Sequence, residues 1–151
     1  MAINYKETFK TVSITKSELN SMINAQEKGL TYLNTNESNS STIAAGLVGF
    51  VGTVLALVFF KKTNIGVGAG ISSLVTSASS SMKQSVSAQG AYGKEDLLET
   101  FRTMTNLGAV SVNMDVAYVT VYDQATLATV VTFVQGLAAN YYTLANGTKV
   151  Y

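Results

Sequence analysis

Residues 43–60 read IAAGLVGFVGTVLALVFF, a segment that is apolar on every side and is followed by Lys61 and Lys62. As one helix, these 18 residues would be about 27 Å long, close to the roughly 30 Å hydrocarbon core of a bilayer. A helix that is apolar all round is covered either by lipid or by protein. The segment therefore predicts a long helix that functions by associating with lipid or with another protein surface.

Small residues recur every three or four positions along this predicted helix. Such a pattern is typical of a seam along which two helices approach closely. We therefore expect Gly49→Leu to block assembly by forcing such a contact apart. The predicted helix-packing seam consists of Ala45, Gly46, Gly49, Gly52 and Thr53.

The next uncharged stretch, residues 63–82, is rich in Ser and Gly and predicts the return arm of a helical hairpin. Lys61 and Lys62 then form the hairpin tip, where two cations would reach lipid headgroups or other phosphates. The whole hydrophobic hairpin is expected over residues 42–88.

Two amphipathic helices are expected on either side of this hairpin. Thr15 and Glu18 have the spacing of a capping box and predict a helix over 15–29. Acidic residues at 95, 96 and 99 favour a helix start, and Gly108 favours a helix end, which together predict a helix over 94–107.

The C-terminal third is harder to interpret. Residues 110–122 fit both the period of a strand and that of a helix, and their β-branched content favours a short β segment. Apolar residues between 127 and 141 follow helical spacing and predict a C-terminal helix over 124–146. The expected fold is therefore a single domain, 1–151, that is all-α or mainly α.

The composition argues against an enzyme. The chain has no His and no Cys, and only 13% of its residues are charged. It therefore lacks the usual proton shuttle, soft metal ligands and thiol nucleophile. The glycines of 66–70 lack the third glycine of a dinucleotide loop, and the Ser-x-x-Lys of 80–83 lacks its companion motifs. No catalytic, cofactor-binding or metal-binding residue is predicted, and no cofactor.

A Gly-rich apolar helix, a Lys-Lys turn and a Ser-rich return arm, in a short chain without Cys or His, resemble the major coat proteins of archaeal spindle-shaped and rod-shaped viruses. The resemblance is compositional and covers mainly residues 42–88. It implies a self-assembling structural protein, a viral coat or filament subunit. Its partners would be copies of itself, with lipid in the shell and nucleic acid contacted only indirectly.

A second role stays open from the same residues. The hairpin 42–88 could insert into lipid, which would make the chain a small membrane-inserting or pore-forming protein. Residues 1–6 lack the apolar core of a secretory signal peptide, which favours assembly inside the cell. The expected location is a virion or extracellular assembly, and the alternative is a membrane.

Overall fold

The segment expected to be one long helix is two short helices in the structure, a computed structural model that describes residues 1–151. Helix α2 spans Ser40–Gly46 and helix α3 spans Gly52–Phe59. Between them the chain is not helical, and Val51 is extended. Three glycines in seven positions explain the break, because each costs a helix interior about 1 kcal/mol relative to alanine.

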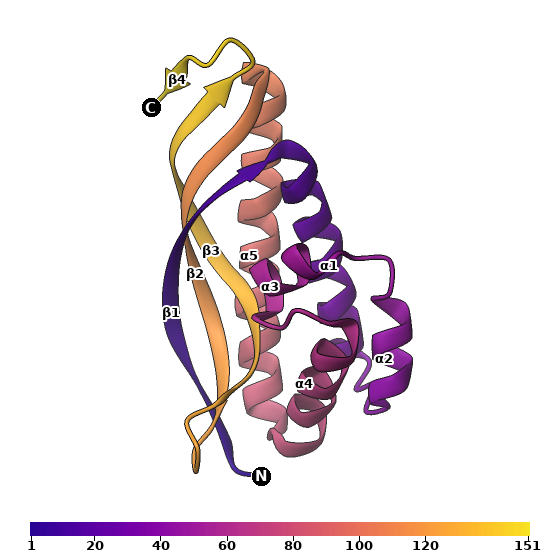
Figure 1. Cartoon of the computed structure of the whole chain (residues 1–151). Coiled ribbons are helices and arrows are strands. Elements are labelled where there is room, and N and C mark those ends of the chain that lie inside the picture. Colours follow the sequence, from indigo (N-terminus) through magenta and orange to yellow (C-terminus); the bar gives the residue numbers. More distant parts are fainter.

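Four antiparallel strands form a sheet in the order β1-β2-β3-β4. The strands are β1 (Ile3–Thr15), β2 (Ala109–Asp123), β3 (Thr129–Leu144) and the very short β4 (Lys149–Val150). Strands β2 and β3 form a hairpin, so the first strand of the chain pairs with a strand more than ninety residues away. This pairing puts β1 at one edge of the sheet (Figure 1).

The remaining helices lie beside this sheet. They are α1 (Lys16–Asn34), α4 (Asn64–Ser77) and α5 (Ser80–Leu107). Figure 1 shows α5 running along the sheet for most of its length, while α1 to α4 gather on one side. One core joins the two layers, and its largest fully buried side chains include Tyr118, Phe59 and Phe133.

The expectation of an all-α or mainly α fold is wrong. Half of the chain is helical and 30% is strand, which makes the fold mixed α/β. The main error lies in residues 124–146, which form β3 instead of a helix. Residues 130–134 are all buried, and a run that is covered on both faces loses the alternation by which a strand is recognised. The short β segment weighed at 110–122 lies within β2.

The helix starts follow local side-chain chemistry. The Thr15 hydroxyl accepts a hydrogen bond from Glu18 N–H, and the Glu18 carboxylate accepts one from Thr15 N–H. This capping box begins α1 at Lys16. Asn39, Thr63 and Ser79 cap α2, α4 and α5 through their side-chain oxygens. The helix expected at 94–107 is the C-terminal part of α5, which ends at Gly108 in the left-handed conformation.

Helix α5 approaches β3 closely enough that a side chain is excluded at the crossing. A Cβ atom on Gly93 would overlap the Val134 carbonyl oxygen, and one on Gly90 would come within 2.6 Å of the Leu30 side chain. Glycine is therefore required for α1, α5 and β3 to meet at this depth.

Candidate functional site

The outer edge of β3 is covered by a side chain that replaces a neighbouring strand. Gln26 of α1 is fully buried. Its Oε1 accepts a hydrogen bond from Val134 N–H at 3.0 Å, and its Nε2 donates to the Val134 carbonyl at 2.7 Å. The same Nε2 donates to the Gly90 carbonyl of α5 at 2.9 Å. One glutamine thus satisfies both outward backbone groups of Val134 and holds α1, α5 and β3 together.

Two further side chains cover other parts of the same edge. Leu137 N–H donates to Oδ2 of Asp96 at 3.2 Å, and Nζ of Lys61 donates to the Thr129 carbonyl at 3.0 Å. At the far end, β4 pairs with Tyr142 and Thr143. The edge is therefore closed to another strand at both ends and in the middle.

The edge of β1 has no such cover over most of its length. Tyr5 N–H donates to its neighbour Asn4 and Thr15 N–H donates to Glu18, so both amides point away from β2. Backbone groups alternate in direction along a strand, so the odd-numbered residues between these two also point outward. No helix, loop or side chain donates to or accepts from those outward groups of Glu7, Phe9, Thr11 and Ser13.

Beside the middle of this edge, around Thr11 and Asp115, the sheet face that points away from α3 is polar and exposed, whereas nearer the start of β1 the same face is covered by α5, where Tyr5 hydrogen-bonds to Ser85 and Val121 is buried. Oδ1 of Asp115 accepts hydrogen bonds from Thr11 Oγ1 at 2.6 Å and from Asn140 Nδ2 at 3.2 Å. Both hydrogen bonds lower the pKa of Asp115 below its usual value, and the bond from Thr11 has the larger effect. Phe9 is an apolar residue on this polar face, and it is 71% exposed. An exposed phenylalanine in the middle of an edge strand is the most conspicuous apolar feature of the sheet.

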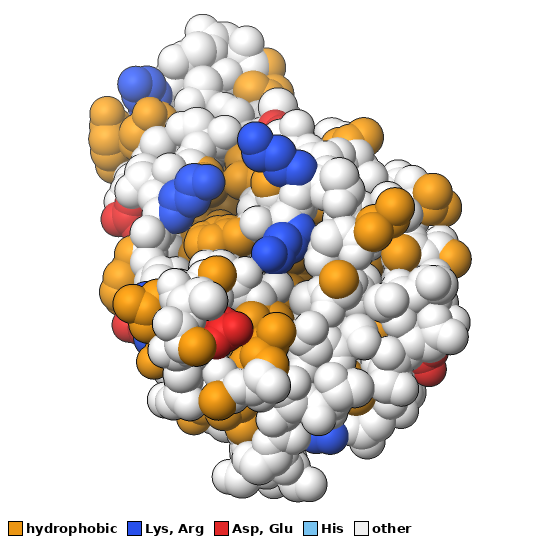
Figure 2. All heavy atoms as spheres, turned by 60° about the horizontal axis from the view of Figure 1, so that its bottom comes forward, with side chains coloured by type: hydrophobic (Ala, Val, Ile, Leu, Met, Phe, Trp, Pro, Cys, Tyr) orange, Lys and Arg blue, Asp and Glu red, His pale blue; other side chains and the backbone are white.

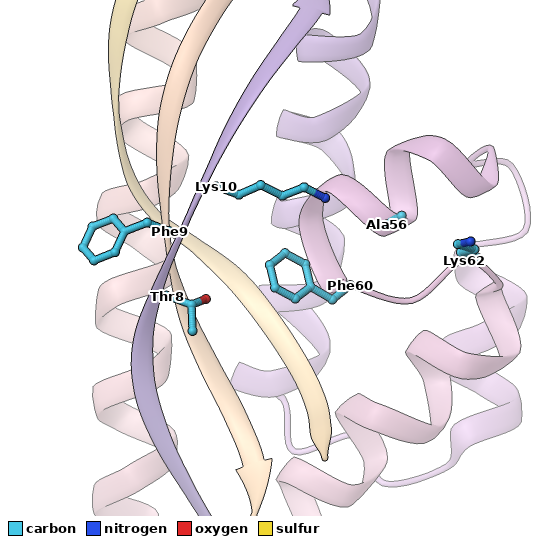
Figure 3. Close-up of a pocket in the computed structure, with 6 residues that line it drawn as sticks. All are labelled: Thr8, Phe9, Lys10, Ala56, Phe60 and Lys62. Atoms are coloured by element: carbon cyan, nitrogen blue, oxygen red, sulfur yellow. The ribbon is translucent and has the colours of Figure 1, made fainter. Parts of the chain in front are cut away.

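A groove lies between β1 and α3 on the opposite face of the sheet. It consists of two adjoining cavities of about 320 and 500 Å³ that share Lys10, Ala56 and Lys62. In Figure 3, Lys10 reaches from β1 toward α3, Lys62 lies beyond Ala56, and the ring of Phe9 points away. The other residues that line the groove are Thr8, Phe9, Gly52, Thr53, Leu57 and Phe60.

The wall of this groove is anchored to the core by Tyr118. Its ring packs 4.5 Å from the ring of Phe60, and its Oη donates to the Leu57 carbonyl at 2.8 Å. Burial raises the pKa of Tyr118 to about 12. The hydroxyl therefore stays protonated and can donate this bond throughout the neutral range.

The charges of the groove are unbalanced. Nζ of Lys10 lies 5.7 Å from the centre of the Phe60 ring, and neither Lys10 nor Lys62 has a carboxylate within 4.0 Å. The only ion pair of the protein joins Lys94 to Glu27 at 3.7 Å. Figure 2 shows basic side chains gathered around apolar ones on this side of the molecule. Nowhere do three or more Asp, Glu, His or Cys residues meet as potential metal ligands.

The residues of the predicted seam do not share one contact. A Cβ atom on Gly49 would meet nothing within 4 Å, whereas one on Gly46 would overlap the Tyr32 hydroxyl and one on Gly52 would lie 2.7 Å from the Lys62 carbonyl. Ala45 and Thr53 are exposed. These residues therefore face several surroundings within the chain, where Gly49→Leu would disturb no helix contact; its effect on assembly stays a prediction.

The two residues of the predicted hairpin tip do lie at the turn between α3 and α4, but they point to different surroundings. Lys61 bonds to β3, and Lys62 lines the groove beside β1. Phe60 precedes them in the left-handed conformation, with φ of 57°.

Comparison of the chain with protein-family models, with curated proteins and with solved structures gives no match. The features of the molecule that bear on its function are therefore the two edges of the sheet and the groove.

Sequence reasoning missed the residues that matter most here. Residues 3–15 were not expected to form a strand, although Val12 and Ile14 alternate with polar neighbours as in a half-buried strand. The sequence around Gln26 does not indicate its role, because both of its hydrogen-bond partners lie more than sixty residues away.

Proposed function

We propose that this chain is a non-enzymatic structural subunit that self-assembles by pairing its β1 edge with the β1 edge of a second copy. The observation that carries the proposal is the contrast between the edges: β3 is covered, and β1 is left open beside an exposed Phe9. An uncovered long edge strand is a template for pairing with another strand. A viral coat or filament subunit, as the resemblance implies, would use such a pairing as its first contact.

The apolar segment 43–60 no longer supports the proposal by itself. Seven of its residues lie in the chain's own core, so the segment does not require a partner to cover it. These buried residues are Ile43, Ala44, Leu47, Val54, Leu55, Val58 and Phe59. The support for self-association therefore comes from the open edge of the sheet.

The arrangement of charges selects one register for the β1 pair. An antiparallel pair that uses all 13 residues of β1 is centred on Phe9, which then lies opposite Phe9 of the second copy. This register pairs outward-pointing residues with each other, as a hydrogen-bonded ladder requires. Moving the centre by one residue places either Lys6 opposite Lys10 or Lys10 opposite itself, and like charges that lie opposite destabilise a pair.

The absence of cysteine allows a direct test of this register. In the centred register, the two Phe9 Cα atoms are about 5.5 Å apart, which suits a disulfide. We expect Phe9→Cys to form a covalent dimer under mild oxidation. Thr11→Cys is the matched control on the same face of the strand, because the two copies of residue 11 would lie roughly 13 Å apart. Equal cross-linking of both variants would refute the register.

Phe9→Pro tests the edge itself. Proline removes the outward N–H of residue 9 and leaves the bonds to β2 in place, so the subunit should fold but not pair. Phe9→Thr retains the donor and removes the ring. Size measured by analytical ultracentrifugation without detergent should show dimers or larger particles for the natural chain and monomers for Phe9→Pro. A natural chain that is monomeric at high concentration would overturn the proposal.

One observation favours the alternative, a membrane-inserting or pore-forming protein acting through residues 42–88. Gly52–Ser77, which comprises α3, the turn after it and α4, is the one segment long and apolar enough to span a membrane by length and composition, although 44% of its most apolar window is buried in the protein. Val48, Val51 and Ile65 are 65–74% exposed near the turns of this region. Dye leakage from liposomes by the natural chain, and its loss on substituting these three residues by Ser, would favour this alternative.

A further inference from the structure

We propose that the groove between β1 and α3 binds an alkyl carboxylate, with the carboxylate between Lys10 and Lys62 and the chain along Ala56, Leu57 and Phe60. This inference concerns a ligand of the single subunit and does not depend on pairing of β1. It starts from the two cavities of about 320 and 500 Å³ that meet at Lys10, Ala56 and Lys62. Cavities of about 300–1,000 Å³ are the usual size of small-molecule sites.

The positive charge of the groove favours an anionic ligand. Lys10 and Lys62 come from different elements, and neither is neutralised by a carboxylate of the protein. No Asp or Glu lines either cavity. Two cations that share an opening attract one anion more strongly than either does alone, because their potentials add.

The body of the ligand is determined by the remaining lining. Ala56, Leu57 and Phe60 present methyl, isobutyl and aromatic surface to the groove that Lys10 and Lys62 also line. All three are only half buried, so a ligand could cover their free surface. An inorganic anion would leave this surface in water, whereas an alkyl chain would bury it at about 25 cal/mol per Å². An alkyl carboxylate combines the anionic head and the apolar body that this lining favours.

The rigidity of the groove supports a preformed site. Tyr118 holds the wall from behind through its bond to the Leu57 carbonyl, and α3 is fixed below by Val58 and Phe59, both fully buried. Thr132 Oγ1 of β3 also donates to the Val58 carbonyl at 2.7 Å. The ligand would therefore meet a wall that needs no rearrangement.

The test is a titration of the ¹⁵N-labelled full chain with decanoate, kept below its micelle concentration. We expect amide shifts to map to Lys10, Thr53, Ala56 and Lys62. Decanol and decyltrimethylammonium should bind at least tenfold more weakly, since they lack the anionic head, and acetate should also bind at least tenfold more weakly, since it lacks the chain. If decanol bound as tightly as decanoate, the proposed role of the two lysines would be overturned. If acetate bound as tightly, the proposed role of the apolar lining would be overturned.

Two double variants distinguish binding in the groove from a general effect of the protein's net charge. Lys10→Gln with Lys62→Gln should weaken decanoate binding at least tenfold. The matched control is Lys28→Gln with Lys149→Gln, which removes two exposed lysines away from the groove and leaves the same net charge. Undiminished binding by the groove variant, with the dispersed amide spectrum of a folded chain, would overturn the assignment, as would equal weakening by both pairs. If the groove variant did not fold, Ala56→Glu in the natural background should abolish binding by repulsion.

Discussion

Gln26 pairs with Val134 as the backbone of a neighbouring strand would, because its carboxamide accepts from the N–H and donates to the carbonyl of the same residue. A side-chain amide has one donor group and one acceptor in the same plane, as a peptide group has. Gln26 is thereby a one-residue substitute for a fifth strand. The fold closes the β3 edge in this way and leaves the β1 edge uncovered over most of its length.

The first prediction concerns this pair. Gln26→Leu should lower the free energy of unfolding by about 3 kcal/mol, because it leaves the buried N–H and carbonyl of Val134 without partners and removes the bond to the Gly90 carbonyl. Urea denaturation measures the change. Gln84→Leu, at an exposed position of α5, is the control and should change stability by no more than about 0.5 kcal/mol. A loss below about 1 kcal/mol for Gln26→Leu would contradict the role assigned to this amide.

The crossing of α5 over β3 gives a second prediction. Gly93→Ala should destabilise the protein by about 3 kcal/mol or more, since the new methyl group overlaps the Val134 carbonyl oxygen and must push the helix away. Gly49→Ala introduces the same methyl group into open space. Thermal unfolding of the two variants should therefore differ strongly, and similar melting temperatures would show that α5 does not cross here as closely as described.

Tyr118 makes stability depend on pH in the alkaline range. Its pKa is about 12 in the folded chain against 10.0 for an ordinary tyrosine. Above about pH 10 the unfolded chain therefore loses this proton more readily than the folded chain, so stability is lost as the pH rises from 10 through 12. Tyr118→Phe, which cannot titrate, should lose less stability between about pH 9 and about pH 11 than the natural chain. Parallel curves of unfolding free energy against pH would contradict the assignment.

Leu127, in the turn between β2 and β3, provides a stabilising substitution. It has φ of 61° and its side chain is 67% exposed, so it adopts a strained conformation and packs against little. Leu127→Asn should raise the free energy of unfolding by about 0.5–1 kcal/mol, because asparagine tolerates the left-handed region better than leucine. Leu107→Asn, at the helical end of α5, should give no gain. A loss of stability at position 127 would mean that the leucine has a packing role that its exposure does not suggest.

Features whose causes are local could be predicted from the sequence. Thr15 and Glu18 lie three residues apart, and their reciprocal hydrogen bonds need nothing from the rest of the chain. The helix end at Gly108 is equally local, since glycine adopts the left-handed conformation at little cost. The absence of His and Cys likewise excludes imidazole and thiol chemistry in whatever way the chain folds.

Long-range packing decided the rest. Whether residues 129–144 became strand or helix depended on burial of both faces and on pairing with β2. The pairing of β1 with β2, the pairing of Gln26 with Val134 and the presence of Lys10 and Lys62 in one groove each bring together segments that are tens of residues apart. The sequence by itself determined where helices can begin and end and which chemistry is absent. Only the tertiary structure decided which strand edge stays open and which lysines line the groove, because distant segments exclude water from one another only when the whole chain packs.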